Sequence, residues 1–177
     1  MRYRDMGAWR ALRLRNEEWL RRWEPTSADS WRSRHSALAF YRLRRDGRIA
    51  AREHRMMPFI VLHGAAIVGQ VNIGPIHWGP ARSADVGYWV DRQRAGRGIA
   101  PVAVGLAINH AFECGLHRVH AAIAPENGPS LRVAEKLGMR REALYERYLD
   151  INGNWRDHIG FALTADDDLT ALHALIG

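Results

Sequence analysis

The stretch that decides the fold reads Val90-Asp91-Arg92-Gln93-Arg94-Ala95-Gly96-Arg97-Gly98-Ile99-Ala100. It follows a segment with the composition of a strand and runs into an apolar segment long enough for a helix. Gly96 and Gly98 allow the backbone to turn tightly and to approach a ligand closely. The free N–H groups of the loop and the positive end of the helix dipole would face the same point. The stretch therefore predicts a pyrophosphate-binding loop, although a glycine pair before a helix also suits a plain tight turn.

The same residues argue against two other phosphate-binding loops. The stretch lacks the lysine followed by serine or threonine that a nucleotide triphosphatase needs. It also fails the dinucleotide-binding pattern, because the third glycine of that pattern would fall at Pro101.

Upstream of the loop the sequence predicts two helices. Apolar residues recur at helical spacing over residues 5–23, and Glu24-Pro25 should stop this helix because the residue before a proline is pushed out of the helical region. Polar residues 26–30 offer caps for a second helix that runs through Trp31 towards Asp46-Gly47.

After Pro58 the sequence predicts strands and helices in alternation. A loop is expected at the glycines and prolines of residues 74–80, the pair Asn152-Gly153 is a strong signal for a tight hairpin, and Asp166-Asp167-Asp168 should cap a short last helix. The other expected elements are strands at 59–62, 67–73 and 84–90, a helix at 99–114 closed by Gly115, a strand at 117–124, a helix at 129–137 ended by Gly138, and strands at 143–151 and 155–163.

This order predicts an α+β fold with a mixed, mostly antiparallel central sheet of about six to seven strands and helices on both faces. The length of 177 residues, 47% hydrophobic and 25% charged, suits a single domain over 1–177 with its core at about 9–163. The single cysteine, Cys114, permits no internal disulfide, so a reducing cytoplasm is the simpler location. We find no secretory signal and no apolar run of membrane-spanning length, so a mature, soluble chain is expected.

Positive charge is concentrated at the start of the chain. Residues 1–57 hold 15 arginines against 7 acidic residues, while the whole chain has a formal net charge of +7. Such a patch attracts polyanions such as ribosomal RNA or an anionic cofactor. The alternative, equally weighted, is a set of solvated helix faces in an arginine-rich chain, in which Lys136 is the only lysine.

A set of motifs resembles one enzyme superfamily. Gln93, Gly96 and Gly98 are followed about thirty residues later by Glu126-Asn127-Gly128-Pro129-Ser130, and then by Glu135-Lys136-Leu137-Gly138-Met139. This combination resembles the GCN5-related N-acetyltransferases, and within them the ribosomal-protein N-acetyltransferases of the RimJ and RimL type. The resemblance covers roughly residues 9–163, and its other matching stretches are residues 84–90, 115–119 and 152–157.

The resemblance implies that acetyl-CoA is the co-substrate and that no metal takes part. The amides of about residues 93–100 would hold the pyrophosphate, and Asn127 with Ser130 would contact the pantetheine. In this superfamily two neighbouring strands splay apart and leave an unpaired amide, here near Tyr88 to Val90, that can polarise the thioester carbonyl. The implied coenzyme-binding residues are Trp89, Val90, Gln93, Arg94, Gly96, Arg97, Gly98, Ile99, Ala100, Asn127 and Ser130.

The resemblance also implies catalytic residues, with one departure from the family pattern. Many members carry a tyrosine as general acid two residues before the Lys-Leu-Gly segment, where this chain has Ala134. Ser130 would then donate the proton to the leaving thiolate or orient the thiol, the alternative being a simple helix cap. Asp85 would accept the proton of the incoming amine through a water, the alternative being a structural role. Trp19, Tyr88 and Tyr148 are the implied substrate-binding residues.

Three functions remain open at this stage. The first is transfer of acetyl to the N-terminal α-amine of a protein, expected to be a ribosomal protein beginning with alanine, by a monomer or homodimer that approaches the ribosome through its basic helices. The second is acetylation of a small-molecule amine. The arginine-rich N-terminal helices disfavour a polycationic amine, although Glu17, Glu18, Glu24 and Asp85 could form a local acidic pocket. The third is a noncatalytic RNA- or ribosome-binding module on a degenerate acetyltransferase fold.

Overall fold

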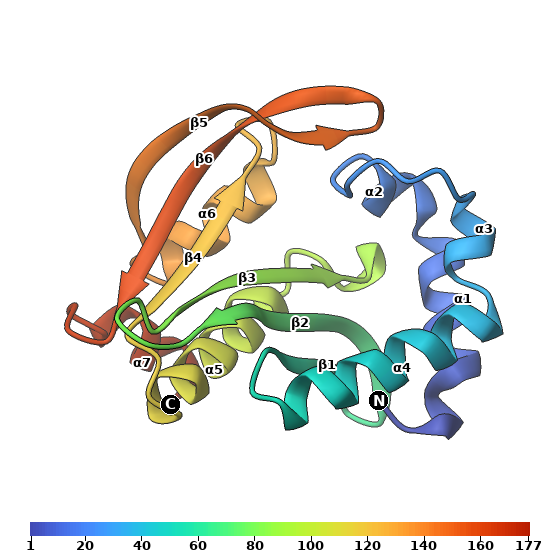
Figure 1. Cartoon of the computed structure of the whole chain (residues 1–177), viewed down its shortest axis with the longest axis horizontal. Coiled ribbons are helices and arrows are strands. Elements are labelled where there is room, and N and C mark those ends of the chain that lie inside the picture. Colours follow the sequence, from blue (N-terminus) through green and yellow to red (C-terminus); the bar gives the residue numbers. More distant parts are fainter.

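The computed structural model describes residues 1–177 and is built on one six-stranded sheet in the order β1-β2-β3-β4-β6-β5 (Figure 1). All neighbouring strands run antiparallel except β3 and β4, which are parallel. The predicted α+β class with a mostly antiparallel sheet is confirmed. The strands are β1 (Met57–His63), β2 (Ala66–His77), β3 (Ser83–Val90), β4 (Arg118–Ile123), β5 (Arg140–Ile151) and β6 (Asn154–Thr164).

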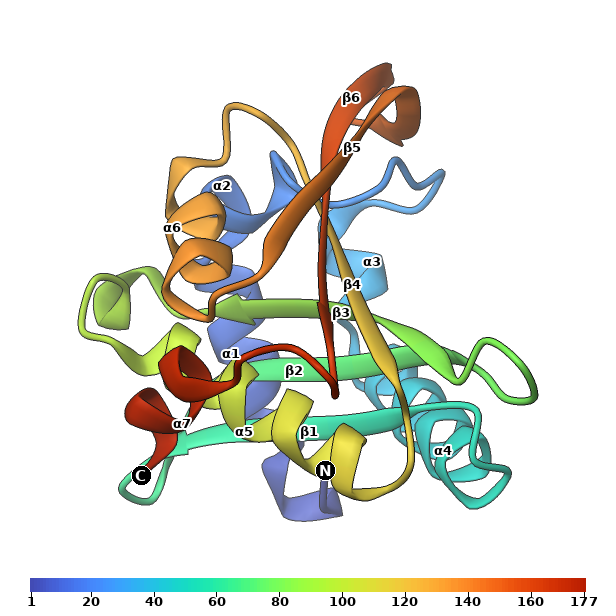
Figure 2. The ribbon, with the colours of Figure 1, turned by 90° about the vertical axis from the view of Figure 1, so that its left-hand side faces the viewer.

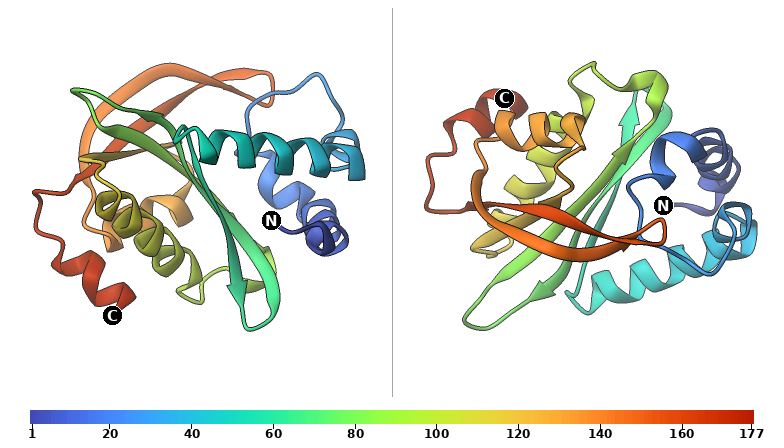
Figure 3. Two further views of the ribbon diagram at one scale, coloured as in Figure 1. Left: turned by 60° about the horizontal axis from the view of Figure 1, so that its bottom comes forward. Right: turned by 90° about the horizontal axis from the view of Figure 1, so that it is seen from above.

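Helices cover both faces of the sheet. Helices α5 and α7 lie on one side, and α1 and α4 lie on the other (Figure 3). None of the helices is both long enough and apolar enough to cross a membrane. The helical elements are the 3-10 turns η1 (Tyr3–Asp5) and η2 (Arg92–Arg94) and the helices α1 (Met6–Arg15), α2 (Glu17–Arg21), α3 (Trp31–Arg34), α4 (Ala37–Arg52), α5 (Ile99–Glu113), α6 (Gly128–Lys136) and α7 (Thr170–Ile176).

The main core fills the space between the sheet and α5. Ile108 of α5, Val119 of β4 and Leu163 of β6 are buried to 1% exposure or less. A second apolar cluster holds the N-terminal helices together, with the ring of Trp9 5.5 Å from that of Phe40. The N-terminal helices therefore form a separate layer rather than an extension of the main core.

The first predicted helix is wrong in one respect, because it breaks at Asn16. The side-chain amide of Asn16 donates to the carbonyl oxygen of Leu12 and to Oδ1 of Asp91, both at 2.9 Å. Its Oδ1 accepts from the backbone N–H of Arg92 at 2.9 Å. These buried bonds reach the glycine loop some 75 residues away in sequence, so helical periodicity alone did not reveal the break.

The second predicted helix is also two helices. Ser30 caps α3 by accepting from the N–H of Ser33, and Ser36 caps α4 by accepting from the N–H of Ala39, each at 3.2 Å. Helix α4 continues through Gly47, the expected stop, to Arg52. Gly47 faces the ring of Pro58 in β1, 3.8 Å from where a Cβ would lie, so tertiary packing outweighs the cost of a helical glycine.

Most predictions for the rest of the chain are confirmed. Helix α5 begins at Ile99 and is followed by Gly115 with φ of +94°, and the β5–β6 turn has positive φ at both Asn152 and Gly153, as its type requires. One difference lies in β2, which continues through the predicted loop at Gly74-Pro75 to His77 with a shift of register. Beyond this irregularity β2 pairs with β3 again. The glycine and the proline had instead suggested that the strand ends there in a loop.

Candidate active site

The site begins where β3 and β4 separate. The two strands pair only over Ser83–Asp85 and Arg118–His120 and then diverge as the arms of a fork (Figure 1). As a consequence the sheet has two parts that differ in direction: β1, β2 and β3 run side by side, and β4 crosses them at a steep angle (Figure 2). The predicted splay is therefore present between these strands.

The fork exposes backbone donors of β3. The N–H of Asp91 donates to the carbonyl oxygen of Val68 in β2 at 2.8 Å. Because N–H groups alternate in direction along a strand, those of Tyr88 and Val90 point away from β2 into the fork. The indole Nε1 of Trp19 donates to the carbonyl oxygen of Val90 at 3.2 Å on this same side. The fork thus holds two oriented amide donors within the predicted stretch.

A cavity of about 570 Å³, here called the glycine-loop cavity, lies beside the start of α5. Gly98 is the N-cap of α5 with φ of +78°, and no side chain caps the helix, so the first-turn N–H groups remain available to a ligand. A Cβ placed on Gly96 or Gly98 would meet nothing within 4 Å, which shows open space at the loop. Arg94, Arg132 and Lys136 supply positive charge to the lining. This combination fits a ligand that carries several phosphate groups.

Asp91 anchors the glycine loop to the N-terminal helices. It is 1% exposed and accepts hydrogen bonds from Arg15, from the Asn16 amide and from the N–H of Gln93. Burial alone would raise the pKa of Asp91, but these hydrogen bonds outweigh burial and hold the pKa below its ordinary value. The carboxylate is therefore charged at neutral pH and fixes the point where the loop leaves β3.

The first turn of α6 forms the opposite wall. The Asn127 side chain caps this helix by accepting from the N–H of Ser130 at 3.3 Å. The alternative role of Ser130 as the helix cap is thus taken by Asn127, and the Ser130 hydroxyl makes no hydrogen bond within the chain. Both residues line the glycine-loop cavity and its neighbour.

The neighbour, here called the fork cavity, measures about 400 Å³ and lies between the diverging strands. Its lining includes small residues, Gly87 of β3 with Ala121 and Ala122 of β4. The two cavities meet at Trp23, Gly87, Tyr88, Asn127 and Ser130, which line both.

Tyr88 occupies the junction of the two cavities. Its hydroxyl lies 3.4 Å from the carbonyl oxygen of Ser130 and donates to it. Burial raises the pKa of Tyr88 to about 12, so the phenol stays protonated at neutral pH. The junction therefore holds two neutral hydroxyl groups, those of Tyr88 and Ser130.

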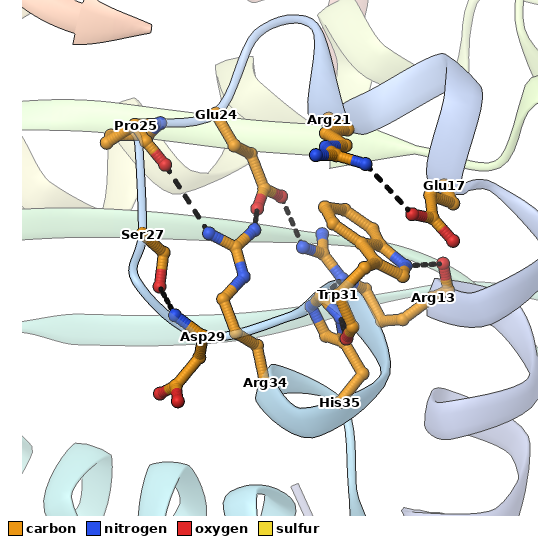
Figure 4. A network of polar contacts seen from close by, with 10 residues as sticks. All are labelled: Arg13, Glu17, Arg21, Glu24, Pro25, Ser27, Asp29, Trp31, Arg34 and His35. Atoms are coloured by element: carbon orange, nitrogen blue, oxygen red, sulfur yellow. Dashed lines mark hydrogen bonds and ion pairs between the residues drawn. The ribbon is translucent and has the colours of Figure 1, made fainter. Parts of the chain in front are cut away.

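A network of polar contacts holds the segment of residues 22–30, whose first four residues line the two cavities (Figure 4). The buried guanidinium of Arg13 donates from Nε to Nε2 of His35 at 2.9 Å and pairs with one oxygen of Glu24. Arg34 pairs with the other oxygen of Glu24. Glu24 lines the glycine-loop cavity but is neutralised by two arginines, and Glu17 pairs with Arg21 at 3.5 Å. The acidic pocket that the sequence left open is therefore already compensated by arginine at these positions.

Pro25 and Thr26 of this segment contact the β5–β6 hairpin. This contact, here called the clasp, joins residues 25–26 to residues 150–153. Pro25 forms a β-bridge with Ile151. The N–H of Gly153 donates to Oγ1 of Thr26 at 2.7 Å. Ile151 and Asn152 also line the fork cavity, so the clasp lies at the border of that cavity.

Most implied site residues lie at these two cavities. Gln93 and Arg97 are exceptions, because both face other hollows on the surface. Tyr148 packs against Tyr145, with ring centroids 5.0 Å apart, and lines neither cavity. Asp85 is exposed at the base of the fork opposite His120 and also lines neither cavity, so its role as a base stays a prediction. The implied site residues that line the glycine-loop cavity are Trp19, Tyr88, Trp89, Val90, Arg94, Gly96, Gly98, Ile99, Ala100, Asn127 and Ser130.

Several lining residues escaped the sequence analysis. Arg132 and Lys136 stand one turn apart on α6 at the glycine-loop cavity, and a search for cations four residues apart on a helix could have found them. Glu24 was read mainly as the residue before a helix-stopping proline. His158 of β6 lines the fork cavity, and no local pattern distinguishes it from any other strand residue.

Comparisons with known proteins agree with this geometry. The chain matches a solved Mycobacterium smegmatis RimJ in complex with CoA-disulfide, with 40% identity and a TM-score of 0.94 over 99% of this chain and 85% of that one. A probable N-acetyltransferase of Bacillus subtilis, YjcK, is 38% identical over 103 residues, which cover 58% of this chain and 57% of the relative. The [ribosomal protein uS5]-alanine N-acetyltransferase of Escherichia coli is 31% identical over 102 residues, which cover 57% and 53%.

These curated relatives are matched over only about half of their own length. The family model described as acetyltransferase (GNAT) domain matches residues 1–140, well over half of the chain. The fold, the family and the coenzyme class expected from the sequence are confirmed by these matches. The chain belongs to the GNAT acetyltransferase family.

Proposed function

We propose that the chain transfers the acetyl group of acetyl-CoA to the N-terminal α-amine of a protein, with a ribosomal protein that begins with alanine as the favoured acceptor. The observation that carries this proposal is the meeting of two unlike cavities at Tyr88 and Ser130. One cavity is cationic and lies at a free helix N-terminus, and the other has glycine and alanine residues in its lining. A phosphate-rich donor and a small aminoacyl end would thus meet at one junction.

The donor half of the proposal rests on the start of α5. The uncapped first turn and Gly96 leave amides and open space for the pyrophosphate, and Arg132 with Lys136 offer charge for further phosphate groups. Acetyl-CoA supplies an acetyl thioester whose carbonyl carbon accepts a nucleophilic amine. The N–H groups of Tyr88 and Val90 would donate to the carbonyl oxygen, as the splay of the strands had implied. The Ser130 hydroxyl would supply the proton to the departing sulfur.

The acceptor half rests on size and charge. Gly87, Ala121 and Ala122 are small residues in the lining of the fork cavity, which suits a small first residue. Arg22 and Arg156 also line this cavity, which disfavours a polycationic amine. The similarity to a ribosomal-protein alanine acetyltransferase supports a ribosomal acceptor, and the basic N-terminal helices suit an acceptor presented beside RNA. With such an acceptor the chain would work in the cytoplasm.

The test is mass spectrometry of products formed by the full chain with acetyl-CoA. Peptides that share one basic tail and begin with alanine, methionine or tryptophan are compared with spermidine and an aminoglycoside. We expect acetyl on the α-amine of the alanine peptide. Acetyl only on the small amines would refute the proposal, and RNA binding with a steep salt dependence but no acetyl transfer would favour the noncatalytic module.

A matched pair of variants tests the acceptor assignment. Ala122→Leu places a larger side chain in the lining of the fork cavity, whereas Leu106→Ala changes an exposed side chain on α5 outside it. We expect Ala122→Leu to raise the KM for the alanine peptide while leaving the dissociation constant of acetyl-CoA unchanged. Equal effects of the two variants would contradict the placement of the acceptor.

A further inference from the structure

His158 is a histidine that the proposed acetyl transfer, as described above, does not use. It lies on β6 next to the end of its pairing with β4, and its side chain is almost fully buried at 4% exposure of the residue. It lines the fork cavity together with Tyr88 and Ser130. A buried imidazole at the wall of the cavity that would receive an amine requires a chemical explanation.

The hydrogen bonding of His158 fixes which ring nitrogen carries the proton. Nδ1 lies 3.1 Å from the carbonyl oxygen of Arg156. A carbonyl oxygen can only accept, so Nδ1 holds the hydrogen and Nε2 of the neutral ring presents a lone pair. Nε2 makes no hydrogen bond within the chain. The imidazole is thus oriented on one side and unpaired on the side that can take up a proton.

Few other groups at this cavity offer a basic atom. Of the side chains that line it, Glu126 and His158 do so, whereas the guanidinium groups of Arg22 and Arg156 can only donate and the buried Tyr88 phenol stays protonated. Glu126 is exposed on the loop before α6. The groups that face the ring from β5 are the aromatic rings of Tyr148, at 5.8 Å in an edge-on arrangement, and Tyr145, its register partner. No carboxylate hydrogen-bonds to the ring to hold a proton there permanently.

We propose that Nε2 of His158 accepts the proton that the acceptor amine loses during acetyl transfer. In this step a bond forms between the amine nitrogen and the carbonyl carbon, the bond between that carbon and sulfur breaks, one amine proton passes to Nε2, and the sulfur takes a proton from the Ser130 hydroxyl. His158 then returns its proton to solvent, and Ser130 regains one. This assignment rests on the proposed acetyl transfer, but not on the acceptor being a protein.

The proposal competes directly with the base predicted from the family resemblance. Asp85 lies at the base of the fork, exposed and outside the cavity lining, whereas His158 lies in it. Proton transfer requires the base within hydrogen-bond reach of the amine or one water away. The two residues therefore make different predictions for the same measurement.

The decisive variant is His158→Asn, since its amide can still donate to the carbonyl oxygen of Arg156 but cannot accept a proton. We expect kcat to fall about 10²- to 10⁴-fold, with the dissociation constant of acetyl-CoA unchanged. The low-pH limb of the kcat/KM profile should disappear. His120→Gln, a histidine of the neighbouring strand outside the cavity, should leave both quantities as in the wild type. Thermal unfolding and acetyl-CoA binding show whether each variant is folded, and His158→Gln serves if His158→Asn is not.

A second acceptor separates loss of a base from loss of shape. Hydroxylamine is largely unprotonated at neutral pH, so no ammonium proton has to be removed before it attacks, and its acetylation should fall less in His158→Asn than that of the alanine peptide. An unchanged pH profile in folded His158→Asn, or a larger loss in Asp85→Asn, would overturn the proposal. If the wild type acetylates only small amines, the protein-acceptor proposal fails, while the comparison of the His158 variants on those amines remains decisive.

Discussion

Thr26 and Asp150, which lie 124 positions apart in the chain, are joined by two hydrogen bonds. The N–H of Thr26 donates to the carbonyl oxygen of Asp150 at 2.8 Å, and its Oγ1 donates to Oδ1 of the same residue at 2.7 Å. These bonds are exposed and complete the clasp. Exposed hydrogen bonds contribute little individually to the free energy of unfolding.

Replacing Thr26 by valine tests the clasp. The variant keeps the shape of the side chain but removes the hydroxyl that Asp150 and Gly153 contact. We expect faster hydrogen exchange of the Gly153 amide and a changed KM for peptide acceptors, with little change in the melting temperature. Ser27→Ala, which removes only a local bond to the N–H of Asp29, is the control. Unaltered exchange at Gly153 would show that the hydroxyl is not what holds the hairpin.

Gly98→Val tests the glycine-loop cavity. Position 98 has φ of +78°, where a β-branched residue is strained, and its side chain would project into space that the pyrophosphate is proposed to fill. The KM for acetyl-CoA should rise at least about tenfold, which corresponds to roughly 1.4 kcal/mol. Gly7→Val, at a glycine of α1 with free space and no positive φ, should leave this KM unchanged. A normal KM in Gly98→Val would remove the loop from the donor site.

Ser130→Ala tests the proton donor. If the hydroxyl protonates the departing sulfur, kcat should fall by about 10²-fold or more, while the dissociation constant of acetyl-CoA stays within about twofold of the wild type. Asn127 retains the helix cap in this variant, so the start of α6 should persist. Equal losses in turnover and donor binding would reduce Ser130 to a binding role.

Tyr88→Phe is the companion to this variant. The phenol donates to the main chain of Ser130 over a long 3.4 Å, and its pKa of about 12 keeps it protonated throughout the usual assay range. We expect a smaller loss of kcat in Tyr88→Phe than in Ser130→Ala. The reverse order would make the tyrosine the proton donor.

His35 makes the stability of the N-terminal layer depend on pH. Burial, followed by the charge of Arg13, lowers the pKa of His35 from 6.5 to about 4. The unfolded chain therefore binds a proton more readily, so the stabilisation is complete above pH 6.5 and is lost as pH falls towards 4. A shift of this size corresponds to a change in the free energy of unfolding on the order of 3 kcal/mol between these pH values. Denaturant unfolding of His35→Gln should lack this dependence, whereas that of His63→Gln, at the exposed end of β1, should retain it.

The sequence predicted those parts of the fold whose signals are local. Helix α5 is bounded by Gly98 and Gly115, and the last hairpin by Asn152-Gly153, and each of these residues adopts the positive φ that the prediction required. The break at Asn16 was missed because its cause is Asp91, which the chain reaches only after folding. Gly47 was misread as a stop because its contact with Pro58 belongs to the packing of α4 on β1.

The site divides in the same way. The residues at the glycine loop could be placed from their spacing, because the loop runs directly into the first turn of α5 and the two therefore face the same ligand. Gln93 and Arg97 belong to the same loop but line other hollows of the surface, a detail of the loop conformation that spacing does not contain. His158 was missed because its importance comes from the fork in the sheet, which brings β6 to β3 across a gap that no pattern within β6 records.

The shared border of the two cavities also bears on inhibitor design. A compound that covalently joins a pantetheine arm to a short aminoacyl group would have to cross the junction, where Gly87 and Asn127 line both cavities. Such a tethered ligand would draw on both cavities at once and pay the cost of association a single time.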